Sequence, residues 1–381
     1  MIRGLTRAVV AISGAGLLAG CGSQHAGVTA ASPPPVTAPL STSLVTTQGT
    51  WAITVMGGPA AAHNNFWQLF VRPAGASRWS LVTPPGVADN GGLVAAGGGG
   101  SLTVGFRPSQ NLAFSPLATS TDAGRNWTPG LLDAVLADTP GAIAVGPSGR
   151  VLALLQDGSI EAAPAASAPD GSTAAGQWTQ LAARDALAAS APGRECGLTG
   201  VTAISFGPDK NPMAAGSCGR PGVAGVFTDA GGTWRSAGLT LPGGSPRVGT
   251  VRALGLAATA GGDVALLAVS GSLFAAWWNG TRWTVSAPVA AGTVRAFGFG
   301  SGGSAWVIPG TGRAETIGGA GASWQALAAL PPGTATLAPG SAGSYDALAA
   351  AGSTLTVWRL ARGGWAKVQL ITVPIQYGSS G

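Results

Sequence analysis

Charged residues are scarce in this chain, since Lys, Arg, Asp and Glu together make up 9% of its 381 residues. So few charges argue against long solvated helices. The formal net charge is +6, but the cations are scattered along the sequence and form no cluster. We therefore expect no nucleic-acid partner, because a nucleic-acid surface needs a basic patch or stripe.

Groups for acid–base chemistry are scarce too. The chain has two Tyr, two His and 14 acidic residues, and no pair of acidic groups stands out as convergent. Hydrolysis of a glycosidic bond needs two convergent carboxyl groups or an equivalent Tyr–Glu pair. His63 lies beside two asparagines and has no metal-ligand companion. The sequence therefore predicts no metal site and no cofactor, and it favours recognition over catalysis.

The first 21 residues have the parts of an export signal. Arg3 and Arg7 form a basic start, and the apolar stretch 8–18 is too short to span a bilayer. It ends in Leu-Ala-Gly before Cys21, which resembles the lipobox of bacterial lipoproteins. The resemblance implies a signal peptide at 1–20 and acyl chains such as palmitate on Cys21. The alternative is an ordinary cleaved signal peptide followed by a free cysteine.

A segment rich in Ala, Ser, Thr and Pro covers residues 21–48. Such a composition cannot bury a core, so we expect a disordered linker here and a folded body at 49–381. Two or three acyl chains hold a protein firmly to a membrane, since one chain binds only marginally. We therefore expect a lipid-anchored protein on the extracytoplasmic face of the cell membrane.

Tryptophan recurs through the body at intervals of 41 to 56 residues. Each of these residues follows a Gly- or Ser-containing turn and begins a short strand. The 63 glycines of the chain suit short strands that are joined by tight turns. We number seven repeats by their tryptophans, which are Trp79, Trp127, Trp178, Trp234, Trp283, Trp324 and Trp365.

Two of the repeat turns nearly complete the pattern Ser-x-Asp-x-Gly-x-Thr-Trp. In such a turn the carboxylate accepts hydrogen bonds from backbone N–H groups, the glycine supplies a positive φ, and the tryptophan packs beneath the turn. The other five turns keep the tryptophan and have lost the aspartate. The two turns contain Asp122, Gly124 and Trp127, and Asp229, Gly231 and Trp234.

These repeats resemble the Asp-box (BNR) repeats of sialidase-like β-propellers, in which the boxes lie away from the active site. The resemblance implies an all-β fold and a structural role for both boxes. Short strands upstream of each tryptophan complete four-stranded blades, so we predict a seven-bladed β-propeller, with six or eight blades as alternatives. Blade 1 is short at its start. Either Ser43–Thr47 or Ile371–Tyr377 would supply its missing strand and close the ring.

Two further cysteines flank a predicted hairpin. Cys196 precedes its first strand and Cys218 ends its second, so antiparallel pairing brings them together. An exported protein meets an oxidising compartment, which predicts a disulfide. Closing a loop of about 20 residues stabilises by roughly 3 kcal/mol. A metal pair or a catalytic thiol is the alternative, but neither cysteine has a nearby histidine.

An enzymatic alternative follows from the sialidase resemblance. Retaining sialidases use an arginine triad, a Tyr–Glu pair and an Asp. The sequence Phe106-Arg107-Pro108 partly matches the family motif Phe-Arg-Ile-Pro but lacks its Ile. An exo-alpha-sialidase would then use Arg107, Tyr345 and Glu195.

A candidate anion site comes from two near-identical segments, GTVRALGL and GTVRAFGF. They place Arg252 and Arg295 at the start of predicted inner strands. Two guanidinium groups at the rim of the central channel could hold a carboxylate or a phosphate. The alternative is repeat duplication with solvated side chains.

The leading hypothesis for function is a monomeric, membrane-anchored propeller of the cell envelope that binds or scaffolds a glycan or protein partner. A small number of ionisable side chains suits rigid recognition better than acid–base catalysis. Exported propellers with degenerate Asp boxes also resemble photosystem-assembly factors, which are non-enzymatic chaperones. The alternatives are the sialidase-type exo-glycosidase and a purely structural envelope lipoprotein.

Overall fold

The structure is a computed structural model, and it describes residues 41–57, 65–87, 92–98, 100–107, 117–130, 139–163, 178–242, 249–259, 262–310, 313–340, 343–362 and 364–374. All of these belong to one compact unit, Pro33–Gly381. Cys21 and His63 lie outside the described residues. Within the described ranges, no helix is both long enough and apolar enough to cross a membrane.

The described chain is almost entirely β-structure. Its strands follow one another in groups of four, and the fourth strand of each group begins at or next to a repeat tryptophan. Repeats 1 to 4 contain β1 (Ser41–Thr46), β2 (Gly49–Gly57), β3 (Asn65–Pro73), β4 (Ser80–Leu81), β5 (Leu93–Gly98), β6 (Ser101–Phe106), β7 (Leu117–Ser120), β8 (Thr128–Gly130), β9 (Ala142–Val145), β10 (Val151–Leu154), β11 (Ile160–Ala163), β12 (Thr179–Ala182), β13 (Leu198–Phe206), β14 (Pro212–Cys218), β15 (Gly225–Asp229) and β16 (Trp234–Ser236).

Repeats 5 to 7 follow the same order, and β21 (Val289–Ala290) is an extra short strand that pairs with β19. Their strands are β17 (Val251–Thr259), β18 (Gly262–Val269), β19 (Ser272–Trp278), β20 (Trp283–Val285), β22 (Val294–Phe299), β23 (Ala305–Pro309), β24 (Glu315–Ile317), β25 (Gln325–Ala326), β26 (Thr334–Pro339), β27 (Tyr345–Ala351), β28 (Thr354–Ala361) and β29 (Gly364–Thr372).

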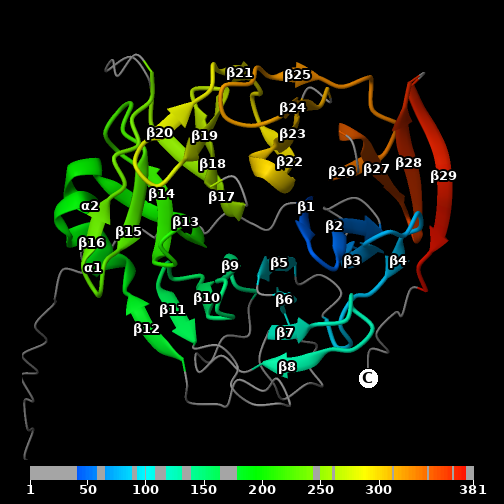
Figure 1. Cartoon of the computed structure of the whole chain (residues 1–381), viewed down its shortest axis with the longest axis horizontal. Helices are drawn as coiled ribbons and strands as arrows, with labels where there is room; N and C mark the ends of the chain where they lie inside the picture. Colours follow the sequence, from blue (N-terminus) through cyan, green and yellow to red (C-terminus); the bar gives the residue numbers. More distant parts are fainter. Residues whose placement is uncertain are drawn as a thin grey trace, which may run out of the picture. The chain divides into compact units, whose positions relative to one another are not determined.

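Within each repeat the strands pair antiparallel from the first to the fourth, and the sheets stand around a common centre with their first strands innermost (Figure 1). This is the arrangement of a β-propeller, so the predicted all-β fold is confirmed. The repeats are linked into five sheets, because repeats 6 and 1 share one sheet and repeats 4 and 5 share another. The count of seven blades therefore stays a prediction.

The first strand of repeat 1 comes from the segment next to the linker. β1 pairs antiparallel with β2 and also parallel with β22, where Thr42 lies opposite Phe297. Of the two segments considered for this strand, the one near Ser43 supplies it, and Ile371 lies instead in the last strand, β29. The boundary expected at 48/49 is therefore too late, because residues 41–46 are already part of a sheet.

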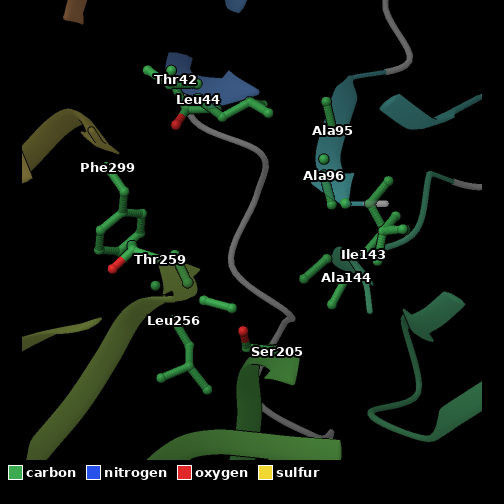
Figure 2. A pocket seen from close by; sticks show the side chains of 18 of the residues that line it. Thr42, Leu44, Ala95, Ala96, Ile143, Ala144, Ser205, Leu256, Thr259 and Phe299 are labelled. Carbon is green, nitrogen blue, oxygen red and sulfur yellow. The ribbon is translucent and has the colours of Figure 1, made fainter. Parts of the chain in front are cut away.

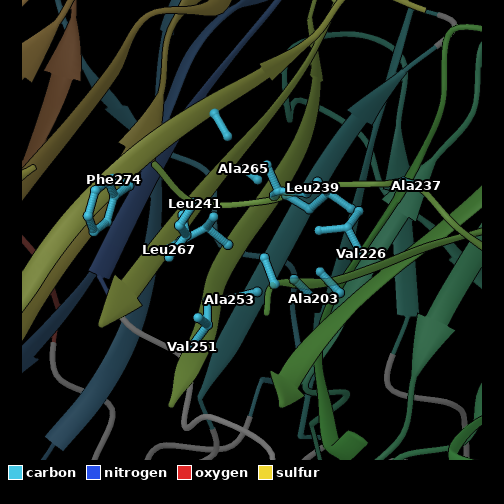
Figure 3. Packing of buried hydrophobic residues seen from close by; sticks show 14 of the residues in the cluster. Ala203, Val226, Ala237, Leu239, Leu241, Val251, Ala253, Ala265, Leu267 and Phe274 are labelled. Carbon is cyan, nitrogen blue, oxygen red and sulfur yellow. The ribbon is translucent and has the colours of Figure 1, made fainter. Parts of the chain in front are cut away.

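Buried residues form clusters at the seams between successive repeats. In the cluster between repeats 4 and 5, Ala203 and Val226 face Val251 and Leu267 (Figure 3). Small residues are needed because neighbouring sheets approach closely. A Cβ atom on Gly255 would lie 2.5 Å from the ring of Phe297. The alternation of small and large side chains lets the sheets interdigitate at the density of a protein interior.

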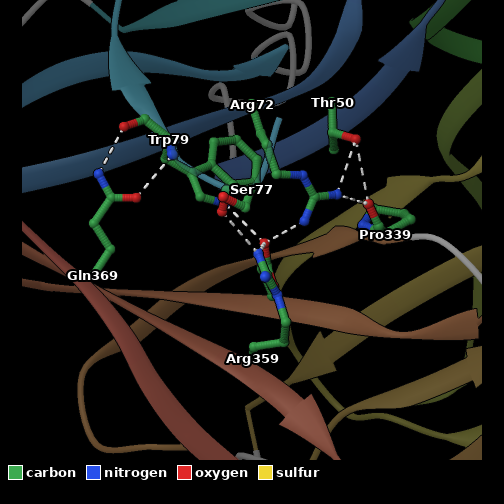
Figure 4. Close-up of polar contacts among 8 residues, drawn as sticks. Thr50, Arg72, Ser77, Trp79, Pro339, Arg359 and Gln369 are labelled. Atoms are coloured by element: carbon green, nitrogen blue, oxygen red, sulfur yellow. Dashed lines mark hydrogen bonds and ion pairs between the residues drawn. The ribbon is translucent and has the colours of Figure 1, made fainter. Parts of the chain in front are cut away.

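The seam between repeats 7 and 1 is also joined by polar groups (Figure 4). The carboxylate of Asp346, which is 1% exposed, accepts hydrogen bonds from Trp79 Nε1 at 2.8 Å and Arg359 Nε at 2.8 Å, and it forms an ion pair with Arg72. Arg72 also donates to Pro339 O at 2.9 Å, and its guanidinium lies over the Trp79 ring. These contacts link strands at the two ends of the body.

A disulfide joins Cys196 and Cys218, as predicted. Cys196 ends the short helix α2 (Ala191–Cys196), which follows α1 (Arg184–Ala189) in the connection between repeats 3 and 4. Cys218 ends β14. The disulfide therefore fixes this helical connection to the sheet of repeat 4.

Candidate functional site

A cavity of about 710 Å³ lies at the centre of the ring. It is lined by the first strands of six repeats, β1, β5, β9, β13, β17 and β22, and by turns that follow them. Figure 2 shows side chains such as Leu44, Ile143, Leu256 and Phe299 around it. Ligand pockets are commonly about 300–1,000 Å³ in size, so the volume is sufficient for a ligand.

The described residues that line this cavity carry no ionisable side chain. The lining consists of aliphatic side chains, the rings of Phe297 and Phe299, glycines and hydroxyl groups. The two rings meet edge to face, with centroids 6.0 Å apart. Val45, a lining residue, is 39% exposed and is one of the exposed large hydrophobic residues of the described chain. The site is therefore apolar with neutral hydrogen-bonding groups.

Backbone edges also face the cavity. Consecutive residues of β5, from Leu93 to Gly98, all line it, so the edge of this strand rather than one face is turned to the centre. In the described part of the chain, β5, β9 and β13 each pair with a single neighbouring strand. The other edge of each strand presents N–H and C=O groups that belong to no ladder.

The arginines expected at the channel rim lie outside this lining. Arg252 and Arg295 are both exposed, and each comes two residues before the point where the lining of β17 and β22 begins. Arg295 Nε donates to Pro309 O at 3.4 Å, across β22 and β23. A shared anion between the two arginines stays a prediction.

The three residues of the enzymatic alternative lie apart from one another. Arg107 is exposed after β6, and Glu195 is exposed on α2. Tyr345 begins β27 and packs in the cluster between repeats 6 and 7, where burial raises the pKa of its hydroxyl. None of these three side chains lines the described cavity. The structure therefore does not bring them together as a catalytic set.

The first Asp-box turn is held by its own side chains. Asp122 Oδ1 accepts a hydrogen bond from the backbone N–H of Asn126 at 2.9 Å, and Oδ2 accepts one from the Asn126 amide at 2.6 Å. These bonds lower the pKa of Asp122 to about 2. Ala123 and Gly124 both have positive φ, at 59° and 79°. Asp122 therefore acts on the turn and not on a pocket.

The second Asp-box turn uses the same carboxylate contact in a shifted form. Asp229, which is 5% exposed, accepts a hydrogen bond from the backbone N–H of Gly232 at 2.8 Å. The two positive φ values fall on Gly231 and Gly232, one position later than in the first turn. Both of these residues are glycines, so this turn avoids the strain that a side chain would bring.

The repeat tryptophans join neighbouring repeats, a role that their spacing alone did not indicate. The indole N–H groups of four of them donate to carbonyl oxygens just beyond the fourth strand of the preceding repeat. Each of these four rings therefore ties its own turn to the sheet of the preceding repeat. The pairs are Trp127 with Val82 at 3.0 Å, Trp283 with Ala237 at 2.9 Å, Trp324 with Ala287 at 3.2 Å and Trp365 with Ala328 at 3.4 Å.

Another buried carboxyl group, that of Asp263, was not singled out in the sequence. It is 1% exposed on β18, and its Oδ2 has no hydrogen-bond partner among the described residues. Burial raises its pKa to about 7, and the negative charge of Asp209 adds to this effect. Asp263 does not line the cavity. Its place at the seam between repeats 4 and 5 gives it a role in stability.

Comparison with known proteins supports the fold alone. No family model matches the chain, and no curated protein matches it in sequence. Solved structures that are similar include a candidate 6-phosphogluconolactonase from Bacteroides uniformis, with 13% identity and a TM-score of 0.52 over 84% of this chain and 96% of that one. A protein from Lactobacillus plantarum has 11% identity and a TM-score of 0.50 over 85% and 96%. YCF48 from Cyanidioschyzon merolae has 16% identity and a TM-score of 0.43 over 90% and 98%. The neighbours of this chain are β-propellers.

Proposed function

We propose that this chain is a lipid-anchored β-propeller of the cell envelope that binds or scaffolds a partner, a glycan or another envelope protein. The central cavity is the observation that carries the proposal. Its lining has neutral hydrogen-bonding groups and apolar side chains, and the described part of it has no group that could move a proton near neutral pH. The lipobox at Cys21 and the linker behind it support the location.

The anchor is tested by Cys21→Ser in the full chain. The wild type should partition into the detergent phase of a Triton X-114 extract and incorporate an alkyne analogue of palmitate. The variant should do neither, because it lacks the sulfur that carries the acyl chains. A wild type that stays in the aqueous phase would contradict the anchor.

The binding role is tested by chemical cross-linking of the full chain in intact cells, followed by purification and mass spectrometry. A partner that is recovered with the wild type, and lost when cavity side chains are changed, supports recognition. The sialidase alternative predicts release of the fluorophore from a 4-methylumbelliferyl sialoside at a rate that Tyr345→Phe abolishes. If the protein is a purely structural lipoprotein, we expect neither a partner that depends on the cavity nor release of the fluorophore.

A further inference from the structure

The cavity has three properties that together restrict what it can bind. Its described lining is uncharged, it is bordered by edges of β5, β9 and β13 that pair with no strand of the described chain, and it contains an exposed apolar side chain, Val45. An anionic ligand such as a phosphosugar or a sialoside would meet no cationic side chain in the described lining. Its desolvation would then be uncompensated.

A neutral glycan fits these groups less well than a peptide. Sugar hydroxyls need several placed polar side chains, and the described lining has no carboxylate, amide, Tyr or Trp to offer. An extended peptide needs a different surface. Its N–H and C=O groups pair with those of a strand edge, and small pockets accept alternate side chains.

The chain itself shows how such a segment sits in this channel. β1, with the sequence STSLVT, is an uncharged strand that lies along the edge of β22, with Ser41 opposite Ala296 and Ser43 opposite Gly298. Across the cavity from this occupied edge, the edges of β5, β9 and β13 have no strand on them in the described chain. We infer that the cavity binds an uncharged, extended polypeptide segment of a partner, aligned along these edges.

This inference rests on the proposed binding function and names its ligand class. A bound strand of about five residues spans roughly 17 Å. Its small or aliphatic side chains would pack on Val45 and Phe299. Hydroxyl groups such as those of Thr42 and Ser205 would form hydrogen bonds with its ends.

The test uses the immobilised full chain and two pools of acetylated, amidated octapeptides. One pool is drawn at random from Ala, Gly, Ser, Thr, Val and Leu, and the other also contains Asp, Glu, Lys and Arg. Retained peptides are measured by mass spectrometry. A mixture of neutral N-acetylglucosamine oligomers is the third arm.

Two cavity variants have matched controls on β29. Val45→Glu places a charge in the cavity, while Val368→Glu places one on an equally exposed valine outside it, since the two are 39% and 46% exposed. Ala258→Trp fills the cavity, and Ala366→Trp adds the same ring at an exposed strand position elsewhere. Each changed position is exposed, so folding should survive, and circular dichroism checks this.

The wild type and both controls should retain the uncharged pool about tenfold more than the cavity variants do, which corresponds to about 1.4 kcal/mol. Equal retention by wild type and cavity variants overturns the inference, and so does preference for the charged pool or the oligosaccharides. If cross-linking in cells still recovers a partner that Val45→Glu leaves unaffected, the binding function stands and the peptide site falls. If cross-linking also recovers no partner, both the binding function and the peptide site are wrong.

Discussion

The buried carboxyl group of Asp263 should make the stability of this protein fall as the pH rises. In the unfolded chain an aspartate has its ordinary pKa of 3.8, whereas burial raises the folded pKa to about 7. Between these two values the folded state holds a proton that the unfolded state has released. The free energy of unfolding therefore decreases with pH across this window and levels off above it.

The magnitude follows from the difference between the two pKa values. A shift of about three units, at 1.36 kcal/mol per unit, gives a loss of about 4 kcal/mol between pH 4 and pH 8. Asp263→Asn keeps the shape of the side chain and cannot ionise. At low pH the free energy of unfolding of the variant should differ from that of the wild type by a constant offset only. At pH 8 the variant should be more stable than the wild type by up to about 4 kcal/mol beyond that offset.

Urea unfolding, followed by tryptophan fluorescence at intervals from pH 4.5 to pH 8, measures this difference. Asp185→Asn is the matched control, because that carboxylate is 83% exposed and pairs with Arg184 at the surface. Its pH profile should follow that of the wild type. If the Asp263→Asn profile also runs parallel to the wild type through the whole range, the reasoning from burial is wrong.

Three other features of the fold are tested by substitution and the same unfolding measurement. Asp346→Asn should lower the free energy of unfolding by about 3–5 kcal/mol, because it leaves the Arg72 side chain, which is 11% exposed, without its counter-ion. A loss below 1 kcal/mol would contradict this. Ala123→Gly should stabilise the fold by about 1 kcal/mol, because glycine adopts a positive φ without strain. Gly124→Ala should destabilise it, because the added Cβ would lie 2.7 Å from Val82. If both variants change the free energy of unfolding in the same direction, this distinction is wrong. The double variant Cys196→Ser, Cys218→Ser should lose roughly 3 kcal/mol of unfolding free energy, and reduction of the wild type by dithiothreitol should cause the same loss. Reduction should not change the stability of the double variant.

The repeat architecture was predictable because it leaves a local signal. The tryptophans recur at the fourth strand of each group, and the short strands expected upstream of each tryptophan are present, for example β14 before Trp234 and β19 before Trp283. The disulfide was predictable for the same reason, since both cysteines flank one hairpin. Local alternation and turn residues fix these elements before any distant contact is made.

The contacts that close the ring were not predictable in this way. Asp346 and Arg72 are 274 residues apart in the chain, and neither belongs to a motif. The parallel pairing of β1 with β22 joins a segment that looks like a linker to a strand of repeat 6. The segment from Ser43 was one of two considered for the missing strand, but its Ser and Thr content also placed it in the linker. Ser43 is 2% exposed, and its hydroxyl accepts a hydrogen bond from Trp306 Nε1 at 3.1 Å. Contacts with distant parts of the chain decide whether such a segment forms a strand.

Asp346 and Asp263 show that buried aspartates can be surrounded in opposite ways at two seams. Asp346 has two arginines and an indole N–H, so its charge is compensated and the seam between repeats 7 and 1 is joined by directional bonds. Asp263 has no such partner within the described chain, and its seam relies on apolar packing. Repeats 7 and 1 are the last and the first along the described chain, whereas repeats 4 and 5 follow one another directly, so directional bonds are most useful at the first of these seams.

The position of β1 would couple the proposed anchor at Cys21 to the cavity. This strand follows the linker directly, closes the sheet of repeats 6 and 1, and supplies Thr42, Leu44 and Val45 to the cavity wall. A chain that begins at Gly49 would lose the parallel ladder on β22 and leave Trp306 Nε1 without the Ser43 hydroxyl. It would also lose one wall of the proposed peptide site. Because β1 both follows the linker and lines the cavity, a force or a partner that draws β1 out of the ring would change binding in the proposed peptide site.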